Sequence, residues 1–278
     1  WEMRTRLFLR TTEFLWQEGH TVHETEIEAK EETAKMLNVY ATFARDYLAL
    51  PVIQGEKTES EKFPGAVTTY CIEAMMQDRK ALQSGTSHFL GQNFAKASEI
   101  KFQNRKGEIE YAWTTSWGVS TRLIGAIIMA HSDDNGLVLP PKIAPSHIAI
   151  IPIYRDAEEQ KQVMTFAEKV QNNLKGLYLD DVPLYTELDT REMTSSERNW
   201  YWIKKGIPLR IEIGPRDIVN NSVMIARRDK EPKEKQAVNY SDLVTYTLQT
   251  LTAMQQGYFQ RALDFRNRWT LEIDEKEE

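Results

Sequence analysis

A proline-rich stretch, residues 137–145, limits how this chain of 278 residues can fold. Pro140 and Pro141 are adjacent, Pro145 follows closely, and such a run continues neither a helix nor the central ladder of a sheet. The halves on either side must therefore build separate cores, and the length suffices for two domains of ordinary size. We predict domains of residues 1–142 and 143–239, followed by a C-terminal helix in residues 240–278.

The second half alternates between strand and helix patterns. Short runs rich in β-branched residues predict strands at 147–153, 182–188, 208–213 and 222–227. Helical periodicity predicts helices at 157–174, 195–206 and about 240–266. This alternation is typical of an α/β domain with a mixed sheet.

The first half mixes the two patterns differently. Two helices are predicted, at 24–45 and 121–131, the first of them rich in glutamate. Strands are predicted at 48–53, 67–72, 80–87 and 112–120. An antiparallel sheet with flanking helices, an α+β domain, accounts for them most simply, so the fold class is α/β overall.

Composition excludes several classes of protein. The formal net charge is −6 and 41% of the residues are hydrophobic, which is too apolar for a disordered chain. The longest apolar run, residues 123–130, is too short to cross a membrane, and no signal peptide opens the sequence. The single cysteine, Cys71, excludes an internal disulfide framework and a cysteine-rich zinc site. We expect a cytoplasmic protein without membrane contact, in which a local basic patch remains free to bind RNA.

The first chemically rich segment is residues 8–21. Strand alternation places five side chains on one face, and these are Thr12, Phe14, Trp16, Glu18 and His20. A carboxylate and an imidazole beside two aromatic rings would make a good wall for a small molecule. The alternative, an aromatic face packed under a helix with Glu18 and His20 at its rim, is left open by the pattern alone.

Two further segments carry polar groups beside glycines. In residues 81–94, Gln83, Thr86 and His88 surround Gly85, which allows close approach of a ligand. In residues 114–125, Ser120 is a suitable N-cap and Arg122 lies in the first helical turn, a combination that suits a polyphosphate. Serine, threonine and histidine occur together, but no acid partner or nucleophile elbow supports a catalytic triad.

These segments resemble the prolyl-tRNA synthetases of the archaeal and eukaryotic-like type, which is also found in some bacteria. Residues 10–20 are similar to the second half of class II motif 2, residues 86–94 to the proline-pocket segment, and residues 116–122 to motif 3. Residues 206–217 resemble the anticodon-binding domain shared by class IIa synthetases. The resemblance implies an ATP-dependent ligase that attaches L-proline to tRNA(Pro) through a prolyl-adenylate.

The resemblance also implies site residues. ATP would be bound by Glu2, Arg10, Thr11, Phe14, Gln83, Thr86, Ser120, Thr121 and Arg122, with Phe14 and Arg122 on the two faces of the adenine. Gln83 would help to hold an ATP-bound Mg²⁺. Proline would lie among Trp16, Glu18, His20, Phe63, His88, Ser116 and Gly118. An aromatic wall with one carboxylate suits a small apolar amino acid that carries a secondary ammonium.

For the tRNA anticodon, the implied contacts lie around residues 208–213 and the helix before them. The candidates are Arg198, Lys204, Lys205, Arg210, Glu212 and Arg216, with Glu197 as a further acceptor for guanine edges. At least two of the basic side chains are expected only to solvate a helix face.

Several parts of the family pattern are not found in the sequence. The motif 2 arginine should stand immediately before Trp1, and motif 1, the upstream Thr-x-Glu loop and the C-terminal domain after Trp269 are missing. We therefore expect a fragment of a longer protein that would be a homodimer. The segment between Thr21 and Trp113 has no room for a large editing insertion.

Two alternatives remain. One is a non-catalytic tRNA-binding fragment or paralogue of a class IIa synthetase. The other is a class IIa synthetase for threonine, serine or histidine. The threonine enzymes usually select their substrate with a zinc ion held by Cys and His, and the isolated Cys71 disfavours that choice.

Overall fold

The computed structural model describes residues 3–272. The chain divides into two compact units, one formed by residues up to Ala130 together with those from Ala262 onward, the other by His131–Arg261. The three domain ranges expected from the sequence remain a prediction. No helix among the described residues is long and apolar enough to span a membrane.

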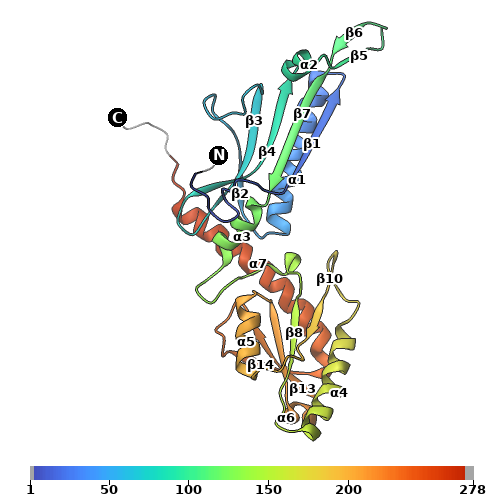
Figure 1. Ribbon diagram of the computed structural model, residues 1–278, viewed down its shortest axis with the longest axis vertical. Coiled ribbons are helices and arrows are strands. Elements are labelled where there is room, and N and C mark those ends of the chain that lie inside the picture. Colours follow the sequence, from blue (N-terminus) through green and yellow to red (C-terminus); the bar gives the residue numbers. More distant parts are fainter. Residues whose placement is uncertain (1–2, 273–278) are drawn as a thin grey trace. The chain divides into compact units, whose positions relative to one another are not determined.

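The first unit is built on a five-stranded antiparallel sheet with the order β1-β7-β4-β3-β2 (Figure 1). Its strands are β1 (Trp16–His23), β2 (Val52–Glu56), β3 (Thr68–Met75), β4 (Ala81–Gly91) and β7 (Trp113–Ser120). The three inner strands of this order, β7, β4 and β3, pair with a neighbour on each side.

Helix α1 (Glu26–Asp46) covers one face of this sheet and contacts β4 and β7 most extensively. It begins with a capping box, in which the Thr25 hydroxyl accepts from the Glu28 N–H and the Glu28 carboxylate accepts from the Thr25 N–H. The Ser87 hydroxyl donates to the Thr33 carbonyl, and the Tyr40 hydroxyl donates to Gln17 Oε1. The opposite face of the sheet is thus left for a site.

The remaining elements of this unit are short. They are α2 (Asn93–Ala97), the hairpin of β5 (Lys101–Gln103) and β6 (Ile109–Tyr111), and α3 (Arg122–His131). The last residues of helix α7 (Leu243–Trp269) also belong here, where Arg266 donates to the Pro51 and Val52 carbonyls and Arg79 stacks on the Trp269 ring at 3.5 Å.

The second unit contains a mixed sheet with the order β11-β8-β12-β13-β14. β8 (Ile148–Pro152), β11 (Thr186–Leu188) and β12 (Leu209–Ile213) are parallel to one another. β13 (Ser222–Arg227) pairs in antiparallel fashion with both β12 and β14 (Lys235–Asn239). Every residue of β8 and β12 is buried. Strands buried on both faces require helices on both sides, and Figure 1 shows α4 (Ala157–Leu174) and α5 (Ser195–Lys204) on either side of the sheet.

Caps set the limits of these helices. Asp156 caps α4, and Thr194 with Glu197 forms a capping box at α5. The unit also contains η1 (Pro141–Ile143), the short pair β9 (Tyr178–Leu179) and β10 (Val182–Pro183), α6 (Pro215–Val219), η2 (Tyr240–Asp242) and the start of α7.

The predicted combination of an antiparallel and a mixed sheet is confirmed, but some element limits are wrong. The strand expected at 48–53 begins only at Val52, because Leu48–Leu50 are occupied in the backbone turn that closes α1. The strand expected at 182–188 is two short strands in different sheets. β1 starts at Trp16, so Thr12 and Phe14 lie outside the strand that was expected to carry them.

Candidate functional site

Two rows of side chains cross the face of the first sheet opposite α1. In the first row, the strand register places His20, Ser116, His88 and Thr69 directly beside one another on β1, β7, β4 and β3. In the second row, Glu18, Gly118, Thr86 and Cys71 follow one another in the same way. Residues on one face of a strand alternate with a period of two, so both rows point to the same side.

A pocket of about 180 Å³ lies beside the second row. Five residues expected to bind ATP line it together with two expected on the proline side, and these are Phe14, Gln83, Thr86, Ser120, Arg122, Trp16 and Gly118. The Phe14 and Trp16 rings meet edge to face with centroids 6.1 Å apart. Gly85, which the sequence suggested for close approach of a ligand, is also in the lining, and Ser84 and Val119, which were not selected from the sequence, complete it.

Arg122 is held in this pocket by backbone carbonyls. Its Nε donates to the Leu9 carbonyl at 3.2 Å and its Nη1 to the Gln83 carbonyl at 3.4 Å. The Arg122 N–H donates to the Ser120 hydroxyl at 3.3 Å, so Ser120 accepts a hydrogen bond from the first residue of α3. A guanidinium fixed by neutral partners keeps its charge uncompensated and available to an anion.

Among the residues predicted to bind proline, two polar side chains lie close together, and so do two rings. His20 Nε2 lies 3.2 Å from a Glu18 carboxylate oxygen. The His88 and Phe63 rings have centroids 5.0 Å apart. Burial lowers the pKa of His88, although the negative charge of Glu18 opposes this shift, so His88 is neutral at pH 7. Ser116 is buried between the two histidines of its row.

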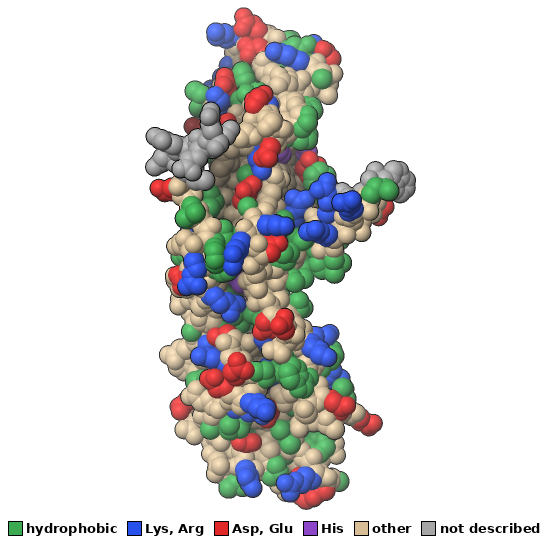
Figure 2. Space-filling view, turned by 90° about the vertical axis from the view of Figure 1, so that its left-hand side faces the viewer, with side chains coloured by type: hydrophobic (Ala, Val, Ile, Leu, Met, Phe, Trp, Pro, Cys, Tyr) green, Lys and Arg blue, Asp and Glu red, His purple; other side chains and the backbone are tan. Residues whose placement is uncertain are grey.

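The remaining predicted ATP residues do not line this pocket. Arg10 lies with Arg4, Arg6 and Leu9 around a separate pocket, and Figure 2 shows a cluster of basic side chains on a projecting part of the surface. Thr11 and Thr121 are partly buried next to residues of the site. Glu2 lies outside the described residues.

The chain is similar to known proteins along its whole length. The model for the tRNA synthetase class II core domain (G, H, P, S and T) matches residues 2–131, and that for the anticodon binding domain matches residues 147–250. The proline–tRNA ligase 2 of Anaeromyxobacter dehalogenans is 55% identical over all 278 residues. The proline–tRNA ligase of Bdellovibrio bacteriovorus is 57% identical over 96% of the chain.

The chain is similar to prolyl-tRNA synthetases, with matches to a class II core domain and to an anticodon-binding domain.

The structural comparison agrees with this similarity. The crystal structure of prolyl-tRNA synthetase from Cryptosporidium parvum, complexed with L-proline and AMP, has a TM-score of 0.87 and 41% identity, and it covers 96% of the chain. The chain spans about half the length of these similar proteins, 54% of both bacterial ligases and 56% of the Cryptosporidium parvum protein. The sheet of the first unit therefore belongs to a class II core domain, and the mixed sheet of the second to an anticodon-binding domain.

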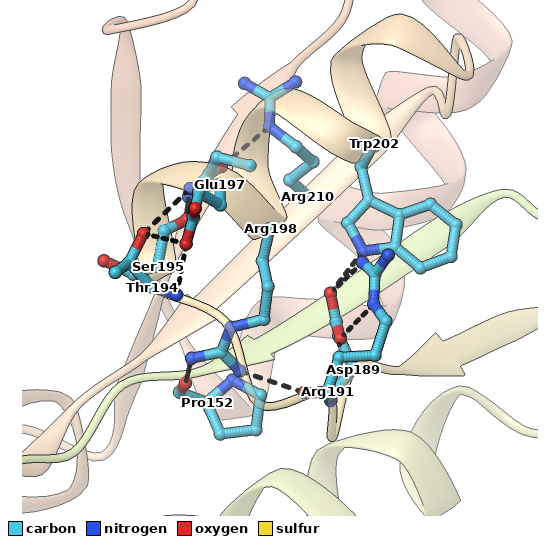
Figure 3. A network of polar contacts seen from close by, with 10 residues as sticks. Pro152, Asp189, Arg191, Thr194, Ser195, Glu197, Arg198, Trp202 and Arg210 are labelled. Carbon is cyan, nitrogen blue, oxygen red and sulfur yellow. Dashed lines mark hydrogen bonds and ion pairs between the residues drawn. The ribbon is translucent and has the colours of Figure 1, made fainter.

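Within the anticodon-binding domain, several predicted tRNA residues make hydrogen bonds inside the fold (Figure 3). Arg198 is buried, and its Nη1 and Nη2 donate to the Asp189 and Pro152 carbonyls at 3.0 and 2.7 Å. Arg210 is also buried, where burial lowers its pKa to about 10, and its Nε donates to Asn199. Neither guanidinium is part of an exposed face, and contact of either one with tRNA stays a prediction.

The two glutamates proposed as acceptors are also occupied. Glu197 closes the capping box of α5 with Thr194. Glu212 is buried and accepts from Asn199 at 2.8 Å and from Lys235 Nζ at 2.6 Å. Lys204, Lys205 and Arg216 are exposed and stay available as predicted contacts.

A second pocket, of about 390 Å³, lies beside the exposed lysines at the end of α5. It is lined by Leu139, Pro145, Ser146, Glu187, Tyr201, Trp202, Lys205 and Ile207. The Lys205 ammonium lies 4.8 Å above the Tyr201 ring, and the Ser146 hydroxyl donates to Glu187 at 2.9 Å. Trp202 is fixed by a bond from its Nε1 to the buried Asp189 carboxylate at 2.8 Å (Figure 3). Sequence reasoning missed the two aromatic residues and Glu187.

Proposed function

We propose that the protein containing this chain is an ATP-dependent ligase that joins L-proline to tRNA(Pro). The observation that carries the proposal is the pair of side-chain rows on the first sheet, which bring three separate sequence segments to one face. High identity to proline–tRNA ligases over the whole chain supports it. The related synthetase from Cryptosporidium parvum was crystallised as a complex with both L-proline and AMP, which also supports it.

We assign the nucleotide to the pocket that Phe14 and Arg122 share. Phe14 is 54% exposed, so a ring face is free to stack on the adenine, while the fixed guanidinium of Arg122 supplies positive charge. In activation, the proline carboxylate attacks the α-phosphorus and pyrophosphate leaves. Positive charge that is already in place lowers the barrier, because no group must reorganise as negative charge develops.

Mg²⁺ would accompany the nucleotide. Among the described residues, no group of three His, Cys, Asp or Glu side chains could hold a metal ion. The Gln83 side chain in the pocket is a suitable single oxygen ligand, and a magnesium ion bound mainly by phosphates and water needs few ligands from the protein. The metal would neutralise phosphate charge.

We assign proline to the neighbouring Glu18, His20, His88 and Phe63. A carboxylate in this group can pair with the proline ammonium, and the aromatic ring of Phe63 can bury the pyrrolidine methylenes. Such a site discriminates only weakly against alanine, because the methylenes that alanine lacks contribute only about 1–3 kcal/mol to the discrimination between substrates.

For the second substrate we propose that tRNA(Pro) places an anticodon base against the pocket at the end of α5. An aromatic wall, a carboxylate and a lysine suit an unstacked base, which is recognised by stacking and by hydrogen bonds to its edges. Transfer of the prolyl group to the terminal ribose would then follow in the core domain.

The finer assignments are also proposals. Resemblance to the archaeal and eukaryotic-like type is supported by 41% identity to the Cryptosporidium parvum enzyme. It is also supported by residues 24–112 between β1 and β7, whose helices and strands belong to the first unit and leave no room for a large editing domain. We propose a homodimer that acts in the cytoplasm, where its tRNA is charged.

Pyrophosphate exchange tests the proposal against the alternative of a non-catalytic tRNA-binding paralogue. The full-length protein should exchange pyrophosphate into ATP with proline, more weakly with alanine, and not with threonine, serine or histidine. A folded protein that binds tRNA(Pro) but gives no proline-dependent exchange would favour the paralogue.

A further inference from the structure

We infer that Thr69 is a positioning residue of the proline site, whose hydroxyl holds both Phe63 and His88 in place. The inference rests on the proposed function, because it takes Phe63 and His88 as walls of that site. It adds a residue that neither the sequence motifs nor the pocket lining selected.

Thr69 ends the first row of side chains. It stands on β3 opposite His88, on the same face as His20 and Ser116, and it is 3% exposed. Because the Thr69 hydroxyl is buried beside His88, it cannot form hydrogen bonds with solvent. Its hydrogen-bond partners in the protein therefore determine its role.

Its hydroxyl has two such partners in the part of the chain that the structure describes. The Phe63 backbone N–H donates to Thr69 Oγ1 at 3.0 Å, and Oγ1 lies 2.9 Å from His88 Nδ1. An N–H can only donate, so the first bond uses a lone pair of the oxygen. The hydroxyl hydrogen then needs an acceptor, and His88 Nδ1 is the one within reach.

This arrangement selects one tautomer of His88. When Nδ1 accepts from Thr69, the neutral ring carries its hydrogen on Nε2. Burial lowers the pKa of His88 and keeps the ring neutral, which is the state this bond requires. His88 therefore presents an N–H donor at Nε2.

Thr69 also anchors the loop between β2 and β3, residues 57–67. Its backbone carbonyl accepts from the Lys57 N–H at 2.8 Å at one end of the loop, and its hydroxyl accepts from Phe63 in the middle. Phe63 is 45% exposed, and its ring contacts the rings of His88 and Phe94. The Thr69 hydroxyl thus holds the backbone of Phe63 where the Phe63 ring lies against the His88 imidazole, with ring centroids 5.0 Å apart.

Removal of the hydroxyl should therefore impair the use of proline selectively. In the full-length protein, Thr69→Val keeps the shape and β-branching of the side chain but loses both hydrogen bonds. We expect the KM for proline in pyrophosphate exchange to rise about 10-fold, with the KM for ATP unchanged. Thr69→Ser keeps the hydroxyl and should restore the KM for proline to within about 3-fold of wild type.

A matched control is available on the same strand. Thr68→Val removes a hydroxyl one residue away, on the opposite face, and should leave the KM for proline unchanged. If Thr69→Val raises the KM values for both substrates equally, or if Thr69→Ser is impaired as much as Thr69→Val, the role is structural and the inference is overturned.

Two further outcomes are separable. If Thr69→Val does not fold, Thr69→Ala takes its place, and equal KM values for proline in the Ala and Ser variants would overturn the inference. If the wild-type protein itself shows no proline-dependent exchange, the proposed function fails. If it does and Thr69→Val behaves like wild type, only the role of Thr69 fails.

Discussion

The buried histidine at the start of β8 makes the second unit sensitive to acid. His147 is fully buried, and its Nδ1 accepts from the Tyr185 N–H at 3.1 Å. Protonation of His147 at Nδ1 would break this bond, because the Nδ1–H and the Tyr185 N–H would then be two donors facing each other. Burial lowers the pKa of His147 to about 4, although the Pro141 carbonyl partly offsets the shift.

The size of the effect follows from the two pKa values. The unfolded chain binds the proton with a pKa of about 6.5 and the folded chain with a pKa of about 4, so stability is full above pH 6.5 and falls as the pH drops below it. At pH 5 the loss amounts to about 2 kcal/mol, and below pH 4 it levels off.

Urea denaturation of the chain at pH 7.5 and at pH 5, followed by circular dichroism, measures this loss. With an m-value of about 2 kcal/mol/M, the midpoint should move down by roughly 1 M. His147→Asn is the matched variant, since its amide oxygen can accept from Tyr185 but does not titrate. Subtracting its pH dependence removes the contributions of all other groups, and identical shifts in the two proteins would refute the reasoning.

Three further predictions concern the proposed activity. Arg122→Ala should lower kcat/KM for ATP about 100-fold. Arg122→Lys should recover little of this loss, because lysine lacks the planar face of the guanidinium. Wild-type ATP dependence in either variant contradicts the assignment of Arg122. His88→Ala should raise the KM for proline more than the KM for ATP in pyrophosphate exchange, and an unchanged value for proline counts against its role. Charge reversal at Lys204 and Lys205 together should weaken tRNA(Pro) binding and reduce the slope of its salt dependence by roughly 0.7–0.9 for each lost phosphate contact. Proline activation without tRNA should stay normal in that double variant, and normal charging at moderate salt would show that the patch is wrongly placed.

The local pattern is sufficient to find the segments of the candidate site. Alternation predicts Glu18 and His20 on one strand face, and they lie there, because strict alternation is a property of the strand itself. The turn from β7 into α3 is equally local, since Ser120 and Arg122 are two residues apart. What alternation cannot provide is the register that joins these segments into rows.

The position of Gln83 illustrates the limit. Regular alternation would place Gln83 and Thr86 on opposite faces of β4, yet both line the nucleotide pocket. The reason is a bulge, because Glu73 pairs with Gln83 whereas Ile72 pairs with Gly85, which leaves Ser84 as an extra residue. A bulge depends on pairing between strands, and a single strand sequence carries no clear signal of it.

The burial of two basic residues in the second unit cannot be predicted from the sequence for a related reason. The sequence alone favours surface positions for Arg198 and Arg210, because arginine is seldom buried. Arg210 lies between apolar residues in β12, which has strands on both sides and helices over both faces. Its burial follows from the place of the strand in the sheet, and that place is decided by long-range pairing.

The irregularities of β4 also affect how the length of this strand can vary. A second extra residue, Leu90, separates the Phe89–Thr115 pair from the Gly91–Thr114 pair, so Thr86 and His88 lie between two bulges. An inserted or deleted residue at either bulge would change only the part of β4 outside the segment between the two bulges. The two rows of side chains would stay intact. The same change between Thr86 and His88 would turn one of them to the α1 face. Related sequences should therefore differ in length at the two ends of β4 and keep a constant spacing within its centre.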